Sequence, residues 1–132
     1  MLPCEDCQSP ANRVLIVDDE PVNRRLAEVL FQKLGWHVTT LESGEQALLH
    51  LGTHRYALVV LDISMPGLTG LDVCQHIRAD PALRELWVVA YTAHAYAADQ
   101  ARFLAGGFDA VLVKPISLQD VRELLQAQVT AP

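Results

Sequence analysis

Four stretches of the chain are unbroken apolar runs of strand length, rich in valine and leucine. They span residues 14–17, 57–61, 86–91 and 110–113. Continuous apolar runs of this length are typical of parallel strands that helices cover on both faces. Residues 36–41 instead mix apolar side chains with histidine and threonine, a composition that favours a fifth strand at an edge of the sheet.

Helical patterns separate these runs. Pro21 suits the first turn of a helix, apolar residues follow at helical spacing as far as Leu34, and Gly35 suits the C-terminus of that helix. Three later helix starts have capping-box spacing, in which a hydroxyl and a residue three positions later satisfy free backbone donors. These pairs are Ser43 with Gln46, Thr69 with Asp72, and Ser117 with Asp120.

A further helix is expected to begin near His94 and to end at Gly106 and Gly107. The strict alternation of strands and helices implies right-handed crossovers and an α/β fold, a doubly wound parallel sheet. In such sheets, function lies beyond the carboxyl ends of the strands, near the point where the winding reverses. The residues that follow the apolar runs are therefore the first candidates for a site.

Length and charge narrow the classes of function. The chain has 132 residues, enough for one domain, and a net charge of −6 with only two lysines. We expect no direct binding to nucleic acid, because no basic face is available to neutralise phosphates. No apolar stretch approaches the roughly 20 residues of a membrane span, and the N-terminus lacks a signal-peptide pattern. The sequence is therefore interpreted as cytoplasmic, with no membrane partner.

The three cysteines give little chemistry. Cys4 and Cys7 form a lone C-x-x-C within residues 1–11, which are interpreted as a flexible leader. Two thiols do not complete a structural zinc site, which takes four ligands, so a metal or redox role is the weaker alternative. Cys74 lies in a helical pattern and is expected to be a packed small apolar residue.

Polar residues directly follow all four apolar runs. Asp18 and Asp19 follow the first predicted strand, Asp62 the third, Thr92 the fourth and Lys114 the fifth. Each residue alone has a structural explanation: the paired aspartates and Thr92 could cap helices, and Lys114 could form an ion pair. Asp62 is the exception, because a carboxylate at the end of a buried strand pays for desolvation unless something positive compensates it.

Together these residues form a chemically complementary set. Clustered carboxylates repel one another without a cation, and Mg²⁺ takes carboxylates, waters and phosphate oxygens as ligands. A fixed carboxylate can attack a phosphoryl group to give an acyl phosphate, while a metal ion and a lysine offset the charge on the oxygens. A hydroxyl such as that of Thr92 can donate to the new phosphoryl group.

With this motif set the chain resembles the receiver domain of bacterial two-component response regulators. The matching motifs are Asp18-Asp19-Glu20-Pro21, Asp62-Ile63-Ser64-Met65-Pro66-Gly67, Thr92-Ala93 and Lys114-Pro115, each after an apolar run. The resemblance covers residues 12–129, leaving residues 130–132 as a tail. It implies a flavodoxin-like (βα)5 fold with strand order 2-1-3-4-5. In finer detail the chain is most similar to stand-alone receivers and to receivers of phosphorelays and hybrid kinases.

The resemblance also implies roles for the site residues. Asp62 would accept a phosphoryl group from a phosphohistidine of a sensor histidine kinase or a histidine phosphotransfer protein. Asp19, Asp62 and the backbone carbonyl of Ser64 would bind Mg²⁺, with Asp18 acting mainly through water. Thr92 and Lys114 would contact the phosphoryl group, and the Lys114–Pro115 peptide would be cis.

The implied protein is a signalling switch and not an enzyme, beyond its own phosphorylation and dephosphorylation. It would act on a downstream effector protein, and a phosphorylation-dependent homodimer is compatible with it. Ser64 and His94 occupy positions that tune phosphoryl lifetime in the family. His37, His50, His54 and His76 share no ligand spacing and are expected on solvated faces, and Arg24 and Arg25 are expected to decorate the first helix.

One departure from the family keeps a second reading open. Receivers usually carry an aromatic residue three positions before the lysine, whereas this chain has Val111. An interaction module that is never phosphorylated would suit that change, although the complete acidic set argues against it. A magnesium phosphatase is a third reading, but Ser64 stands where such enzymes carry a second acid or base.

Overall fold

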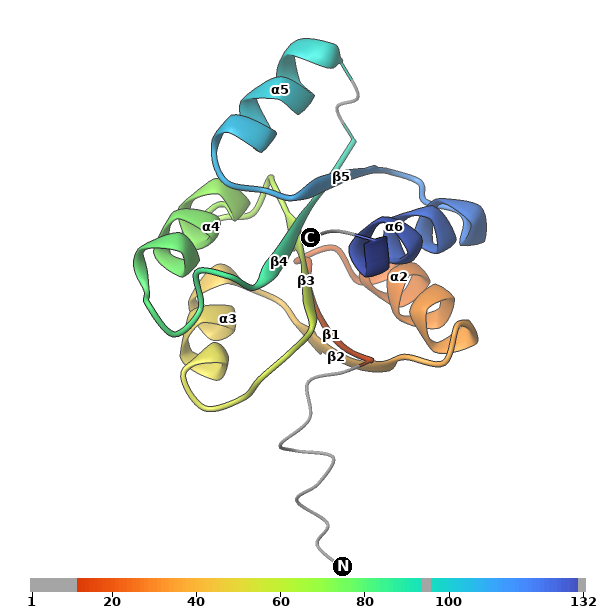
Figure 1. Cartoon of the computed structure of the whole chain (residues 1–132), viewed down its shortest axis with the longest axis horizontal. Coiled ribbons are helices and arrows are strands. Elements are labelled where there is room, and N and C mark those ends of the chain that lie inside the picture. Colours follow the sequence, from red (N-terminus) through yellow and green to blue (C-terminus); the bar gives the residue numbers. More distant parts are fainter. Residues whose placement is uncertain (1–11, 94–95, 131–132) are drawn as a thin grey trace, which may run out of the picture.

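The computed structural model describes residues 12–93 and 96–130, which form a parallel sheet between two layers of helices (Figure 1). The strands are β1 (Arg13–Val17), β2 (His37–Leu41), β3 (Leu58–Asp62), β4 (Trp87–Thr92) and β5 (Ala110–Val113). The helices are α2 (Pro21–Lys33), α3 (Gly44–Leu51), α4 (Gly70–Ala79), α5 (Ala97–Ala105) and α6 (Leu118–Thr130). The predicted alternation is confirmed, and every strand lies within one residue of its predicted bounds.

The sheet order confirms the predicted doubly wound topology. Neighbouring strands follow the order β2-β1-β3-β4-β5, and every pair is parallel. The chain leaves β1 for β2 at one edge and then crosses to β3 on the other side of β1. The carboxyl ends of β1 and β3 therefore flank the point where the winding reverses, and Asp18 and Asp62 lie there.

Each face of the sheet has its own hydrophobic core. Helices α3, α4 and α5 cover one face, and α2 and α6 cover the other (Figure 1). Successive residues of β1 alternate between them: Leu15 packs in the first core, whereas Val14 and Ile16 pack in the second. Because both faces are covered, the central strands are apolar except at their ends, which explains the unbroken runs.

The helix ends follow the local sequence signals, with one exception. Thr69 with Asp72 and Ser117 with Asp120 form reciprocal capping boxes. Ser43 Oγ also accepts the predicted bond from the Gln46 N–H, but the Gln46 side chain accepts from the Glu42 N–H. The helix expected to begin near His94 begins instead at Ala97, after an N-cap residue, Tyr96, that makes no side-chain cap. Residue 94 itself lies outside the described part of the chain.

The start of α4 is packed closely against the end of β3. A Cβ atom on Gly70 would lie 2.5 Å from the Asp62 carbonyl oxygen, well inside van der Waals contact. The Gly70 N–H donates to the Ile63 carbonyl at 3.3 Å. Glycine at this position therefore lets the helix approach the strand end that carries Asp62.

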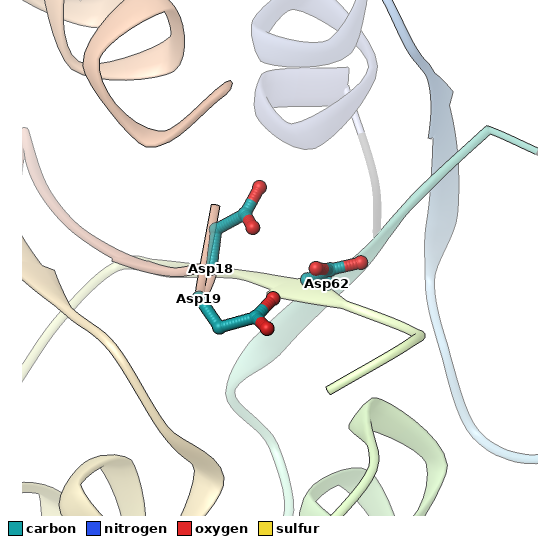
Figure 2. A group of neighbouring side chains, drawn as sticks. All are labelled: Asp18, Asp19 and Asp62. Atoms are coloured by element: carbon teal, nitrogen blue, oxygen red, sulfur yellow. The ribbon is translucent and has the colours of Figure 1, made fainter. Parts of the chain in front are cut away.

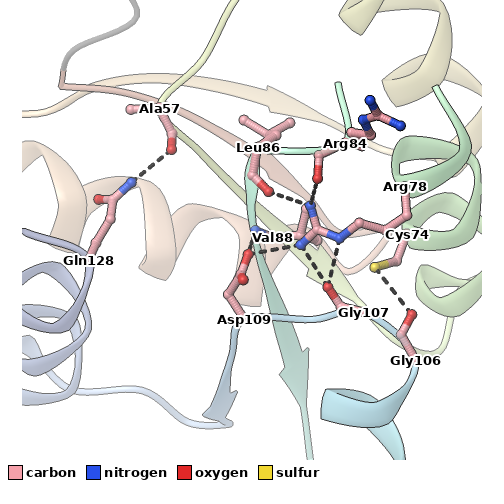
Figure 3. Close-up of polar contacts among 10 residues, drawn as sticks. All are labelled: Ala57, Cys74, Arg78, Arg84, Leu86, Val88, Gly106, Gly107, Asp109 and Gln128. Carbon is pink, nitrogen blue, oxygen red and sulfur yellow. Dashed lines mark hydrogen bonds and ion pairs between the residues drawn. The ribbon is translucent and has the colours of Figure 1, made fainter. Parts of the chain in front are cut away.

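Arg78 connects α4 to the loops that precede β4 and β5 (Figure 3). Its guanidinium donates to the carbonyl oxygens of Gly107, Arg84 and Leu86, at 2.6–2.9 Å, and pairs with Asp109 at 2.9 Å. The planar fork of arginine can satisfy several acceptors at once, which a lysine cannot do in the same geometry. This cluster holds α4 against the start of β5, the edge strand that Lys114 follows.

Two other sequence interpretations can be compared with the structure. Cys74 is a buried free cysteine, as expected. His50 does not lie on a solvated face: it is half-buried, bonds through Nε2 to the Tyr56 hydroxyl at 2.5 Å and stacks on His54 at 3.9 Å. Burial, reinforced by the nearby His54 and Arg13, lowers the pKa of His50.

Within the described residues, no helix combines the length and apolar character needed to cross a bilayer.

Candidate functional site

The loop after β1 places two carboxylates at the switch point. Asp18 is fully buried, and its N–H continues the sheet by donating to the Leu41 carbonyl at 3.1 Å. Its Oδ1 accepts the Glu20 N–H at 2.8 Å, while Asp19 is exposed. Neither aspartate caps α2, because the N-cap is Glu20, whose side chain accepts the Val22 N–H. The helix-capping explanation for the aspartate pair therefore does not hold.

Asp62 ends β3 beside these carboxylates. It is 4% exposed, and its Oδ1 accepts the Ser64 N–H at 3.2 Å. One carboxylate oxygen from each of Asp18, Asp19 and Asp62 lies within 4.8 Å of the others, and Figure 2 shows the three side chains at the ends of β1 and β3. The structure thus brings together the three predicted acidic residues.

Lys114 supplies positive charge from β5. Its Nζ lies 3.2 Å from Asp18 Oδ2 and 3.3 Å from Asp62 Oδ1, and the side chain is only 13% exposed. The Lys114 N–H donates to the Thr92 carbonyl at 2.7 Å, which ties the ends of β4 and β5 together. Sequence reasoning expected a carboxylate partner for Lys114; the structure gives it two.

Thr92 ends β4 and is 2% exposed. Helix α5 begins five residues later at Ala97, so Thr92 does not cap it. Ser64 follows Asp62 by two residues and is exposed. All the residues predicted for the site therefore lie at one edge of the sheet, as the parallel topology requires.

The electrostatic balance of the site is unfavourable without a cation. Burial, together with the hydrogen bond and charge of Asp18, raises the pKa of Asp62 to about 7, against the opposing effects of Lys114 and the Ser64 N–H. Asp18 Oδ2 is buried and accepts no hydrogen bond from any described residue, so it faces only the Lys114 ammonium. Two of the three clustered carboxylates, Asp18 and Asp62, thus share one ammonium group.

This donor set fits a hard divalent cation. Three carboxylates within reach of one another, one of them exposed to incoming waters, match the oxygen ligands that Mg²⁺ prefers. The unsatisfied oxygen of Asp18 and the raised pKa of Asp62 both indicate negative charge that a cation would stabilise. Histidine and cysteine ligands are absent from the cluster formed by the described residues, which suits magnesium better than zinc.

Sequence reasoning missed two contributors to the site. Arg24 was interpreted as surface decoration, yet its Nη1 donates to the Asp18 carbonyl at 2.8 Å and supports the acidic loop. Arg25, by contrast, does lie on the surface and pairs with Glu28. Tyr91 is fully buried, with its ring centroid 4.6 Å from Lys114 Nζ. The available signal was a tyrosine at the end of an otherwise mostly aliphatic run.

The geometry gathers an acidic cluster, a lysine and a hydroxyl at the switch point of a doubly wound sheet, and comparison with known proteins agrees. The family model of the response regulator receiver domain matches residues 14–126. The chain belongs to this family. The resemblance seen in the sequence is therefore confirmed over nearly the whole described chain.

Relatives of two kinds resemble this receiver domain. The polar-differentiation response regulator DivK of Brucella anthropi is 33% identical over 114 residues, which cover 86% of this chain and 93% of DivK. The signal transduction histidine-protein kinase BarA of Escherichia coli K12 is 34% identical over 125 residues, which cover 95% of this chain. The chain spans only 14% of the length of BarA.

Solved structures match the receiver over most of its length. The receiver domain of the sensor histidine kinase PA1611 from Pseudomonas aeruginosa PAO1 is 30% identical, with a TM-score of 0.82 over 90% of this chain and 98% of that one. That crystal structure holds a magnesium ion coordinated in the active site cleft. A response regulator from Chloroflexus aurantiacus superposes with a TM-score of 0.85 over 90% of this chain and 98% of that one; at 24% identity it supports the fold alone.

Proposed function

We propose that this receiver is a phosphoryl acceptor that takes a phosphoryl group onto Asp62 from a phosphohistidine of a partner protein. The observation that carries the proposal is the placement of the Asp62 carboxylate. It lies 3.3 Å from the Lys114 ammonium and within 4.8 Å of the Asp18 and Asp19 carboxylates. A buried carboxylate next to a cation site and an ammonium suits attack on a highly charged phosphoryl group.

The transfer exchanges one bond to phosphorus for another. An Asp62 carboxylate oxygen forms the new P–O bond, the P–N bond of the phosphohistidine breaks, and its electron pair returns to the imidazole of the donor. Lys114 donates to the phosphoryl oxygens, and the hydroxyl of Thr92 donates to the same group. Both residues lie at neighbouring strand ends joined by the bond between the Lys114 N–H and the Thr92 carbonyl.

Mg²⁺ is the proposed cofactor. Asp19, Asp62 and the backbone carbonyl of Ser64 would hold it directly. Asp18 would act through water, because its Oδ1 already accepts the Glu20 N–H and its Oδ2 faces Lys114. When bound, the ion supplies charge that offsets the phosphoryl oxygens. The magnesium in the PA1611 receiver supports this choice.

The proposed protein is a switch with two classes of partner. The donor would be a sensor histidine kinase or a histidine phosphotransfer protein, in line with the kinases and response regulators among its relatives. The output would be a downstream effector protein, reached in the cytoplasm and without contact to nucleic acid. Phosphorylation adds about 1.5–2 negative charges, which would pull Thr92 and the following loop toward Asp62 and alter the surface offered to the effector.

The test compares wild type with Asp62→Asn in the presence of Mg²⁺ and beryllofluoride, a mimic of the phosphoryl group. Backbone amide spectra of wild type should change around the ends of β3, β4 and β5, whereas those of Asp62→Asn should not. Asp80→Asn is the matched control: Asp80 is exposed and accepts the Ala82 N–H, a bond that an Asn oxygen can retain. Equal responses of wild type and Asp62→Asn would overturn the proposal and favour a module that works without phosphorylation.

A further inference from the structure

Tyr91 is the penultimate residue of β4 and the largest fully buried side chain of the described chain. It pairs in register with Asp62 on one side and with Leu112 on the other. Its side chain lies in the core beneath α2 and α6, whereas Val111 packs against the opposite core. The aromatic residue of this site is therefore on the other face of the sheet from the position where the family usually carries one.

The ring of Tyr91 faces the only ammonium of the site. Lys114 Nζ lies 4.6 Å from the ring centroid, well within the distance at which a cation is attracted to an aromatic face. The same Nζ lies 3.2 Å from Asp18 and 3.3 Å from Asp62. Two carboxylates and one ring thus surround the ammonium.

The hydroxyl of Tyr91 bonds to α2. It donates to the Asn23 carbonyl in the first turn of that helix, at a long 3.4 Å. Burial, with the Asp18 and Asp62 charges, raises the pKa of Tyr91, so that the phenol stays neutral. A neutral ring with an intact hydroxyl can attract the ammonium without adding charge to the acidic cluster.

We propose that Tyr91 is a positioning residue that holds the Lys114 ammonium at Asp62. The inference rests on the proposed function, because it assigns a part in phosphoryl binding. Lysine has a flexible stem, so fixing its ammonium costs side-chain entropy. When Asp62 carries a phosphoryl group, the Lys114 ammonium loses one of its two carboxylate partners. Its attraction to the Tyr91 ring does not depend on that carboxylate and remains. The ring therefore keeps the ammonium within reach of the phosphoryl oxygens in both states.

The first test reads the position of Lys114 directly and needs no phosphorylation. The chain has two lysines, Lys33 and Lys114, so selective ¹³C-lysine labelling gives two side-chain signals. The methylene next to the Lys114 ammonium should show an upfield ring-current shift in wild type and in Tyr91→Phe. In Tyr91→Leu its signal should move to the position of the exposed Lys33. Identical Lys114 shifts in wild type and Tyr91→Leu would overturn the inference.

The second test measures phosphoryl binding as the affinity for beryllofluoride with saturating Mg²⁺. Loss of the ring in Tyr91→Leu should weaken this affinity about tenfold, the size of a partly buried cation–π attraction. Tyr91→Phe, which keeps the ring, should stay within about twofold of wild type. Tyr91→Met, close to leucine in size but unbranched, provides a second ring-free variant if Tyr91→Leu folds poorly.

Phe31→Leu is the matched control for lost packing. Phe31 is fully buried in the same core as Tyr91 but contacts Trp36 rather than the site. It should lose stability and keep its beryllofluoride affinity. Equal affinities of Tyr91→Leu and Phe31→Leu, or a Tyr91→Phe variant as weak as Tyr91→Leu, would overturn the role of the ring. If wild type itself fails to bind beryllofluoride, the proposed function fails, while the lysine signals still decide the position of Lys114.

Discussion

Removing the Lys114 ammonium should destabilise the receiver strongly when no cation is present. The Lys114→Met variant keeps an apolar stem of similar length and leaves Asp18 and Asp62 without a counter-charge. At an effective dielectric constant of about 20, unit charges separated by 3.2 Å attract by about 5 kcal/mol. Desolvation of the ammonium offsets part of this attraction, and the loss of one partner of a buried ion pair typically costs about 3–5 kcal/mol.

We expect Lys114→Met to lower the free energy of unfolding by about 3 kcal/mol at pH 8, near the lower limit of this range. The reason is that Asp62 can become neutral by taking up a proton. Its pKa is already raised to about 7 by burial and by Asp18, and removal of Lys114 raises it further. Of the two attractions that the variant loses, the one to Asp62 exists only while Asp62 is ionised. The cost of Lys114→Met should therefore grow as the pH rises through about 7 and shrink at pH 6.

The measurement is urea unfolding in EDTA at pH 6 and pH 8, repeated with saturating Mg²⁺. Mg²⁺ should recover part of the lost free energy of unfolding, because a divalent cation replaces the missing charge. Lys33→Met is the control, since Lys33 is exposed in the last turn of α2 and should cost only a few tenths of a kcal/mol. Equal unfolding free energies for Lys114→Met and Lys33→Met in EDTA at pH 8 would refute this electrostatic reasoning.

Three further predictions test other parts of the structure. In thermal unfolding, Gly70→Ala should lower the free energy of unfolding by about 2 kcal/mol, because its Cβ would lie 2.5 Å from the Asp62 carbonyl oxygen, and it should also weaken Mg²⁺ binding. The control, Gly52→Ala at an exposed helical C-cap, should leave the free energy of unfolding nearly unchanged. In urea unfolding, Arg78→Met should lower the free energy of unfolding by about 2–3 kcal/mol, because three carbonyl groups lose their donor and Asp109 keeps only its bond from the Val88 N–H. The exposed Arg102→Met should stay within about 0.5 kcal/mol of wild type. The Mg²⁺ dissociation constant, measured by calorimetry, should rise about sevenfold from pH 7 to pH 5.9 and level off above pH 8, because protons compete for a carboxyl group whose pKa is about 7. A constant affinity from pH 6 to pH 8 would contradict that assignment.

Most of the fold followed from local signals in the sequence. The apolar runs located four of the five strands because helices bury both faces of this sheet, and the mixed composition of residues 36–41 located the edge strand β2. The residue types at the helix starts located the capping boxes. The start of α5 was wrong because no side chain caps it, so the sequence holds no signal at Ala97.

The site was predictable in its members but not in its contacts. Parallel strands carry their carboxyl ends to one edge, so topology alone gathers Asp18, Asp62 and Lys114. Which carboxylate oxygens the Lys114 ammonium faces depends on side-chain packing. The spacing of residues along the sequence does not determine it. Arg24 reaches the Asp18 carbonyl from one turn of α2, and Tyr91 reaches Lys114 across two neighbouring strands. Both contacts depend on tertiary structure and were therefore missed.

The central claim is that Asp62 forms an acyl phosphate. The direct measurement is to incubate the protein with Mg²⁺ and acetyl phosphate or phosphoramidate, reduce with borohydride, and locate the reduced residue by mass spectrometry of peptides. Borohydride converts an aspartyl phosphate to homoserine and leaves free aspartate unchanged. We expect homoserine at position 62 and its loss in Asp62→Asn, with Asp18 and Asp19 unmodified. Recovery of unmodified Asp62, or reduction at another aspartate, would contradict it.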